Sequence, residues 1–146
     1  MKNPQKIKKI HLPVNDQDKP VIIGIVSSDQ DYKLSLKINR KLSFTLRNIK
    51  PVEIEDTNGN TLIFSRFIQE GSDNENIIQL ISNRSEKSFL LSRLRNIDYI
   101  MLISGPSRLQ LSDNITPLIK EIDSVSGVFR IDLEKILKER NLGLLF

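Results

Sequence analysis

Short apolar runs separated by polar turns recur along the chain and predict a β-sheet. The clearest run, residues 21–26, is rich in β-branched side chains and predicts a central strand, in which Gly24 indicates that another segment packs close to the backbone. The Asn-Gly pair at 58–59 predicts a hairpin with a type I′ turn, since these residues tolerate the positive φ that both central positions need. Further strands are expected over residues 6–12, 52–55, 62–68, 77–81, 99–103 and 128–131.

Two main helices are expected. In residues 29–42 the apolar side chains alternate as in a strand, yet three of them also lie four apart on one helical stripe. The spacing of Ser28 and Asp31 approximates a capping box, and basic residues gather toward the far end, where the helix dipole favours them. These two features favour the helix. A second helix is expected over 112–122, with N-cap candidates at its start, and a short C-terminal helix over 133–140.

These elements predict a single α+β domain spanning residues 1–146, with residues 1–6 as a flexible tail. The expected architecture is an antiparallel or mixed sheet of about six or seven strands. Two main helices are expected to pack on one face, followed by the short C-terminal helix. For residues 84–97 the pattern does not choose between a helical turn and an extended connection.

The sequence contains no cysteine and one histidine, His11. This excludes disulfides, thiolate nucleophiles and cysteine-bearing metal sites, and it excludes Ser-His-Asp or multi-histidine sites within one chain. Acidic residues are present, but without the spacing of an EF-hand loop. We therefore expect no metal, no cofactor and no catalytic residue. No apolar stretch is long enough to span a membrane, so the expected location is the cytoplasm, without a membrane partner.

The net charge of +4 is unevenly distributed. Residues 1–50 carry eleven Lys or Arg against four Asp or Glu, whereas residues 51–81 carry one against six. A basic surface attracts phosphates, although it also serves solubility. The cluster that could contact nucleic acid comprises Lys37, Arg40, Lys41, Arg47 and Lys50.

Two Asp-Tyr dipeptides, Asp31-Tyr32 and Asp98-Tyr99, are candidate binding residues. An acid beside a phenol can form a binding pocket, or a general acid/base pair if burial raises the carboxyl pKa. The structural alternative is that Asp31 stabilises the start of a helix and that Asp98 caps a loop where the chain enters a strand.

Arg66 is a further candidate binding residue, because it is a charge within an otherwise apolar strand. Its guanidinium could bind a carboxylate or phosphate through two hydrogen bonds. The alternative is a position on the solvent face, paired with Glu53 or Glu55 across the hairpin.

Residues 91–99, with the sequence LSRLRNIDY, resemble the IPExxxVDY family of small bacterial proteins. Similar segments occur over residues 23–32, 64–67, 127–132 and 144–146. Ser92 and Arg93 stand where the family motif has proline and glutamate. The family has no assigned activity, so the resemblance implies a bacterial, cytosolic, single-domain protein with a helix at 29–42 and supplies no mechanism.

The sequence predicts a non-enzymatic binding or interaction module, because reactive side chains are few and scattered. The expected partner is another protein, or a second copy that pairs through an edge strand. One alternative is an RNA- or DNA-associated accessory protein that uses the basic residues of 33–50. Another is a small hydrolase or isomerase that relies on carboxylates alone.

Overall fold

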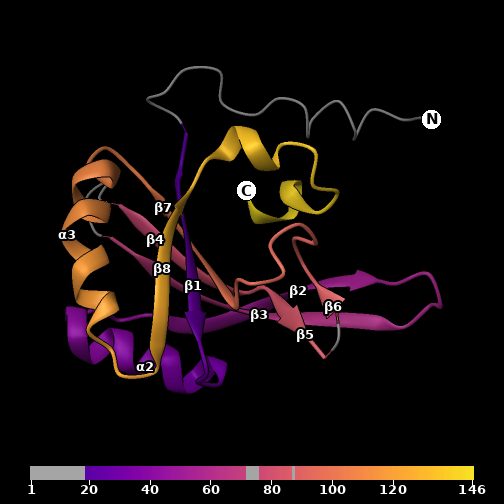
Figure 1. Ribbon diagram of the computed structural model, residues 1–146, viewed down its shortest axis with the longest axis horizontal. Coiled ribbons are helices and arrows are strands. Elements are labelled where there is room, and N and C mark those ends of the chain that lie inside the picture. Colours follow the sequence, from indigo (N-terminus) through magenta and orange to yellow (C-terminus); the bar gives the residue numbers. More distant parts are fainter. Residues whose placement is uncertain (1–18, 72–75, 87) are drawn as a thin grey trace.

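The computed structural model describes residues 19–71, 76–86 and 88–146, so the expected tail and the expected strand at 6–12 lie outside the described residues. The fold class is α+β, as predicted from the sequence (Figure 1). The elements are β1 (Val21–Ser27), α2 (Asp31–Leu42), β2 (Arg47–Glu55), β3 (Thr61–Glu70), β4 (Ile77–Ser82), β5 (Arg84–Ser85), β6 (Ser88–Phe89), β7 (Tyr99–Ser104), α3 (Arg108–Lys120), β8 (Val125–Ile131) and the 3₁₀ turns η1 (Leu133–Ile136) and η2 (Leu142–Leu145).

Six strands form one sheet in the order β2-β3-β4-β7-β1-β8, and every neighbouring pair is antiparallel. The predicted central strand, β1, lies between β7 and β8 with its first five residues buried. A Cβ added to Gly24 would lie 2.8 Å from side-chain atoms of both Ile97 and Ile131. The glycine therefore permits the close packing that the sequence indicated.

The predicted hairpin is present as β2–β3, but the prediction that its turn is of type I′ is wrong. Gly59 has φ +84°, whereas Asn58 is not among the residues with positive φ. The Asp56 carboxylate accepts hydrogen bonds from the N–H groups of Asn58 (2.8 Å) and Asn60 (2.9 Å), and Gly59 N–H donates to the Asp56 carbonyl. This pattern is typical of a type I turn followed by a left-handed glycine, which needs only one positive φ.

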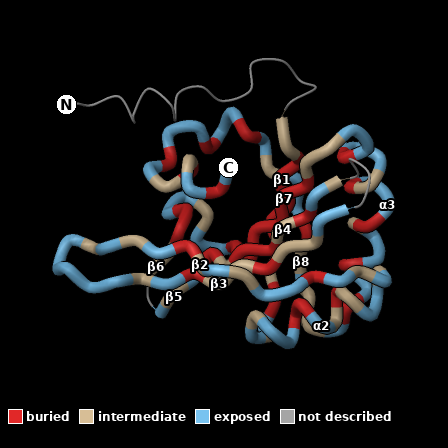
Figure 2. Tube along the Cα trace, turned by 180° about the vertical axis from the view of Figure 1, so that it is seen from behind, coloured by how far each residue is buried: buried red, intermediate tan, exposed pale blue. Residues whose placement is uncertain are grey.

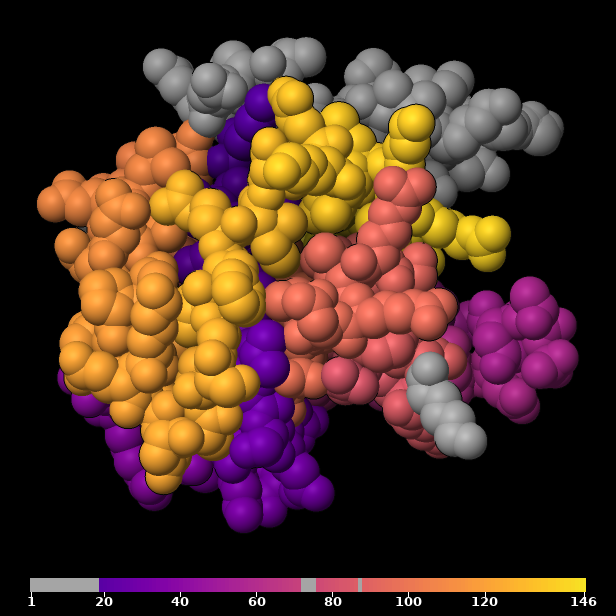
Figure 3. Space-filling view, in the orientation of Figure 1, coloured from indigo at the N-terminus to yellow at the C-terminus, as the bar shows by residue number. Residues whose placement is uncertain are grey.

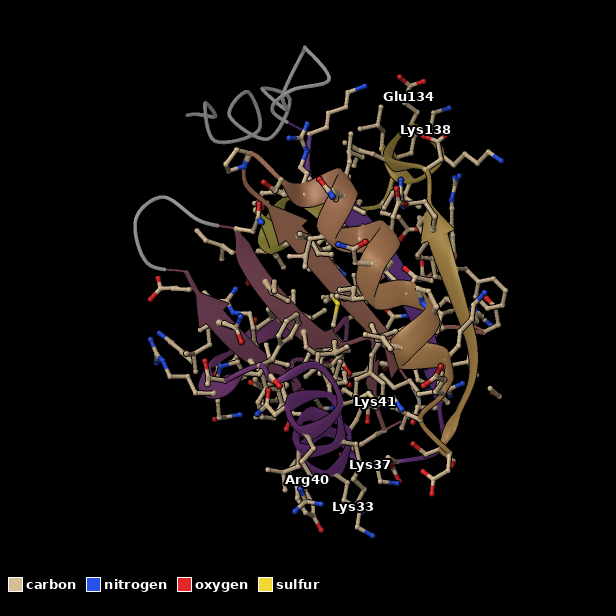
Figure 4. All side chains as sticks on the ribbon, turned by 90° about the vertical axis from the view of Figure 1, so that its left-hand side faces the viewer. Lys33, Lys37, Arg40, Lys41, Glu134 and Lys138 are labelled. Atoms are coloured by element: carbon tan, nitrogen blue, oxygen red, sulfur yellow. The ribbon has the colours of Figure 1, made fainter. Side chains whose placement is uncertain are left out.

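Both main helices cover one face of the sheet (Figure 4). Helix α2 is present, but it begins at Asp31, two residues after the predicted start. Its N-cap is Gln30 and no side chain caps it, so the predicted capping box of Ser28 is wrong. Helix α3 begins at Arg108, four residues before the predicted caps. Arg108 is buried and donates hydrogen bonds to the carbonyls of Lys19 and Gly105, contacts that the local sequence does not reveal.

Irregular chain covers the opposite face of the sheet (Figure 3). The C-terminal residues, which were predicted as a helix over 133–140, instead form the short turns η1 and η2. Their buried residues join residues 90–97 in a second hydrophobic cluster around Phe64 and Ile100. The central strands are buried from both sides as a result (Figure 2).

The buried side chain of Asn83 organises residues 90–97, which belong to the segment 84–97 whose conformation the sequence pattern left open. Its Nδ2 donates to the carbonyls of Leu94 (2.8 Å) and Ile97 (3.0 Å), and its Oδ1 accepts from Leu91 N–H (2.8 Å). Asn83 is 0% exposed, so each of these backbone groups is paired without water. This side chain thus replaces the hydrogen bonds that a helix or strand would supply.

Glu139 fastens the C-terminal residues to the same loop. Its side chain is 2% exposed, and its two carboxylate oxygens accept from Ser92 N–H and Arg93 N–H at 2.9 Å each. Arg93 Nε lies 3.8 Å away and partly balances the charge. A buried carboxylate held by backbone donors forms strong, charge-assisted hydrogen bonds, so it fixes the two segments to each other.

Replacing Asn83 with alanine is expected to destabilise the fold strongly. The variant leaves Leu91 N–H and the Ile97 carbonyl unpaired, whereas the Leu94 carbonyl keeps its bond from Ile97 N–H, and each buried unpaired group costs about 1–3 kcal/mol. We expect the free energy of unfolding, measured by urea denaturation, to fall by about 2 kcal/mol or more. The control Asn96→Ala removes an exposed asparagine from the same loop and is expected to change stability by less than about 0.5 kcal/mol. Equal losses in both variants would contradict this role.

Candidate functional site

A cleft of about 640 Å³ lies where β1 ends and α2 begins. Four of the five candidate binding residues line it: Asp31, Tyr32, Asp98 and Tyr99. The strand pairing explains why the two dipeptides meet. Ile25 lies opposite Tyr99 in the antiparallel pair β1–β7, so the residues that follow β1 lie beside those that precede β7. The remaining walls come from Ile63 and other residues on the β2–β3 hairpin and β4, which adjoin this end of β1 (Figure 1).

Asp98 is held on both of its carboxylate oxygens. Oδ2 accepts from Ser27 N–H at the end of β1 (2.9 Å), and Oδ1 pairs with Arg84 Nε. Asp98 thus has a structural role, but not the predicted one, since its carboxylate caps the end of β1 rather than the loop that enters β7. Its side chain is 16% exposed, so the pair lies at the wall of the cleft.

Arg84 is the cleft residue that sequence reasoning missed. Its guanidinium also donates to the Arg95 carbonyl (3.3 Å) and lies 4.9 Å from the centre of the Phe89 ring. In the sequence Arg84 is recognisable only as an arginine that follows Asn83, at the start of the segment 84–97 whose conformation the pattern did not predict. These contacts hold the cation in place beside Asp98.

Tyr99 is a buried hydrogen-bond donor. It is 6% exposed, and its hydroxyl donates to the Asp29 carbonyl at 2.6 Å. Burial raises the pKa of Tyr99 well above its usual value, and the nearby carboxylates of Asp31, Asp98 and Asp29 raise it further. The phenol therefore stays protonated and anchors the β1–α2 connection.

Asp29 is ionised and paired. Its Oδ2 lies 2.8 Å from Lys37 Nζ, and the hydrogen bonds from Lys37 and Ser124 hold the pKa of Asp29 below its usual value. Lys37 also contacts Asp123 at 3.0 Å, and these two acids raise the pKa of the lysine. This network ties α2 to the connection between α3 and β8.

Asp31 and Tyr32 present accessible groups to the cleft. Asp31 lies in the first turn of α2, as predicted, and its Oδ1 accepts from Tyr32 N–H at 2.6 Å. Tyr32 and Ile63 are each 53% exposed, and Leu36 is 48% exposed one turn further along α2. The exposed lining of the cleft therefore includes two large apolar side chains beside the Asp31 carboxylate, together with the polar Ser28 and Gln30.

Arg66 does not belong to the cleft. Successive side chains of β3 point to opposite faces of the sheet. Ser65 lines the cleft, so Arg66 lies on the other face, which it shares with the buried Phe64. The predicted pairing with Glu53 or Glu55 is wrong, since Arg66 lies opposite Ile49 in the β2–β3 register. The hairpin aligns Glu53 with Ile63 instead, three positions before Arg66.

The basic cluster is partly neutralised. Lys37 is paired as described, Lys41 Nζ lies 2.7 Å from Glu121, and Arg47 lies 3.6 Å from Glu70. Arg40 and Lys50 are exposed, and the labelled cations of α2 project from one end of the molecule (Figure 4). Fewer of these cations are free to bind phosphate than the sequence suggests.

Within residues 19–71, 76–86 and 88–146, no group of three or more His, Asp or Glu side chains is arranged to hold a metal ion. No helix in this part of the chain is long and apolar enough to cross a membrane.

Comparison with known proteins found no matching family model, no matching curated protein and no matching solved structure. The resemblance to the IPExxxVDY family therefore stays a prediction.

Ionisation of Tyr99 is expected to destabilise the protein at alkaline pH. Because burial raises the pKa of Tyr99 above its value in the unfolded chain, the folded state keeps a proton that the unfolded state releases. The resulting contribution is complete below the unfolded pKa of about 10 and declines as pH rises above it. Urea unfolding at about pH 8 and pH 11 should show a smaller decline for Tyr99→Phe than for the natural sequence. Tyr32→Phe removes the only other tyrosine and should keep the natural decline. An unchanged decline in Tyr99→Phe would contradict the assignment.

Proposed function

We propose that this protein is a non-enzymatic interaction module whose cleft receives a segment of a partner protein with a basic side chain beside an apolar one. The observation that supports this proposal is the composition of the cleft, in which exposed Tyr32 and Ile63 lie beside a surplus of carboxylates. The cysteine-free sequence supports the cytoplasm as the place where the module acts.

The charge balance of the cleft favours a cationic group. Three aspartates and one arginine line it. Lys37 pairs with Asp29 and Arg84 pairs with Asp98, whereas no basic side chain in the described part of the chain pairs with Asp31. A lysine or arginine of a partner would complement this carboxylate and would steer the approach of the two proteins.

The apolar part of the cleft favours a protein segment over a small polar molecule. Tyr32 and Ile63, which line the cleft, are each about half exposed. Large apolar side chains that are exposed together are typical of interaction surfaces, and a tyrosine ring also attracts a cation held over its face. An extended segment could place an apolar side chain against Ile63 and a basic one between Asp31 and Tyr32.

The contacts of the polar groups support recognition rather than bond-making chemistry. Tyr99 keeps its proton, and Asp98 is engaged through both oxygens. The Ser27 hydroxyl lies 3.3 Å from Ser124 Oγ, and the Ser82 hydroxyl donates to the Arg84 carbonyl. Nucleophilic catalysis requires a base within hydrogen-bond reach of the nucleophile, and neither hydroxyl has one in the described part of the chain.

A peptide titration followed by NMR tests the proposal. The probes are two blocked tripeptides, Leu-Arg-Leu and Leu-Glu-Leu, added to the labelled full chain. We expect the arginine peptide to shift the amide signals of Asp31, Tyr32 and Ile63, with a Kd on the order of 1 mM, and the glutamate peptide to bind at least about fivefold more weakly. Asp31→Asn should weaken the arginine peptide by about fivefold, the ratio that corresponds to about 1 kcal/mol.

Two remote variants serve as controls. Glu134→Gln removes a carboxylate of η1 that is 70% exposed and lies beside Lys19, before the start of β1, and Leu109→Ala removes an α3 leucine that is 56% exposed. Both should bind the arginine peptide as the natural sequence does. The proposal fails if the two peptides bind equally well, or if the shifted signals lie away from the cleft.

A further inference from the structure

The outer face of α2 is exposed although it carries large apolar side chains. Leu34 and Ile38 point to the sheet and are buried in the core. On the opposite side of the helix Tyr32, Leu36 and Arg40 are exposed. These three residues follow one another at intervals of four, so they form one row along the helix surface. Rows of this spacing are the ridges with which one helix packs against another.

The two ends of this row have opposite charges that lack partners. At the C-terminal end, Lys41 pairs with Glu121, whereas Arg40 makes no ion pair in the described part of the chain and projects from the molecule (Figure 4). At the N-terminal end, Asp31 lies beside Tyr32 in the cleft and likewise has no basic partner among the described residues. Each end of the row therefore lacks the group that the other end offers.

We infer that the segment received by the cleft is α2 of a second copy of the chain, which packs antiparallel against α2 about a two-fold axis beside Leu36. In this dimer Leu36 contacts its own copy, and Arg40 of each chain binds at Asp31 and Tyr32 of the other. The inference rests on the proposed function, because Arg40 and Leu36 supply the basic and apolar side chains for the same cleft.

The sequence of α2 is complementary to itself about Leu36. Arg40 follows Leu36 by four residues and Tyr32 precedes it by four, so each lies about 6 Å from the centre along the helix axis. Lys41 and Asp31 are likewise each five residues away. A two-fold axis at the centre brings positions at equal distances together. The cations of one copy therefore meet the carboxylate and the aromatic ring of the other, twice in each dimer.

The remaining cations of α2 do not oppose this pairing. Lys33 precedes Leu36 by three residues, and the residue at the same distance on the other side is the uncharged Asn39. Lys37 is already neutralised within its own chain by Asp29 and Asp123. A helix of unrelated sequence would not share this match of charges, which favours a second copy as the partner.

Sedimentation equilibrium of the full chain, from micromolar to millimolar concentration, tests the inference. Each α2 is about 18 Å long, so the interface is small and the dimer is expected to have a Kd on the order of 100 µM. Arg40→Glu places a carboxylate opposite Asp31 at both contacts and should weaken the dimer by at least about tenfold. The control Lys138→Glu makes the same charge reversal at the end of the molecule opposite α2 and should leave the dimer unchanged (Figure 4).

A mixture of two variants tests whether the contacts are reciprocal. Asp31→Lys alone also places like charges at both contacts and should weaken the dimer. When Asp31→Lys and Arg40→Glu are mixed in equal amounts, the new lysine of one chain meets the new glutamate of the other, and the natural Arg40 meets the natural Asp31. We expect the mixed dimer to recover to within about threefold of the natural Kd. Circular dichroism verifies that each variant folds.

Three results would overturn the inference. The first is a natural chain that stays at its 16.8 kDa monomer mass at every concentration. The second is a dimer that Lys138→Glu weakens as much as Arg40→Glu does. The third is a mixture that associates as weakly as its two components.

The two tripeptides separate this inference from the proposed function. Arg40 does not line the cleft, so the monomeric Arg40→Glu variant keeps the residues that bind the peptide. This variant should bind Leu-Arg-Leu and still discriminate against Leu-Glu-Leu. Equal binding of the two peptides by the variant contradicts the proposed function. Normal discrimination by a natural chain that never dimerises overturns only the pairing with a second copy.

Discussion

The hydrogen bonds of the buried Asn83 side chain order the irregular chain segment that lies on the sheet face opposite the helices. They close residues 91–97 into a loop that covers the sheet face opposite the helices. The loop then offers two backbone donors to the buried carboxylate of Glu139, which fixes the C-terminal residues. It also ends at Asp98, beside Arg84, so the amide that orders this face also builds one wall of the cleft. Loss of the Asn83 hydrogen bonds would therefore lower the stability of the fold and also disturb the wall of the cleft.

The antiparallel pairing of β1 with β7 has the same dual effect. It brings Asp31 and Tyr32 next to Asp98 and Tyr99, although residues 33–97 lie between the two dipeptides. Most polar groups at this junction are used to fasten segments to one another. The accessible groups include the Asp31 carboxylate and the apolar side chains of Tyr32 and Ile63, a combination that suits the binding of a protein segment better than proton transfer.

Local pattern was sufficient for most of the strands, for helix α2 and for the role of Gly24, because alternation, helical stripes and a glycine in a buried run are properties of neighbouring residues. The two Asp-Tyr dipeptides were also recognisable from residue type alone. The start of α3 was not, because the hydrogen bond of Arg108 to the Lys19 carbonyl joins residues that are distant in the sequence. The conformation of 84–97, the cleft wall at Arg84 and the position of Arg66 away from Glu53 likewise followed from long-range pairing and register. A side chain's neighbours across a sheet are set by which strands pair, and no local pattern carries that information.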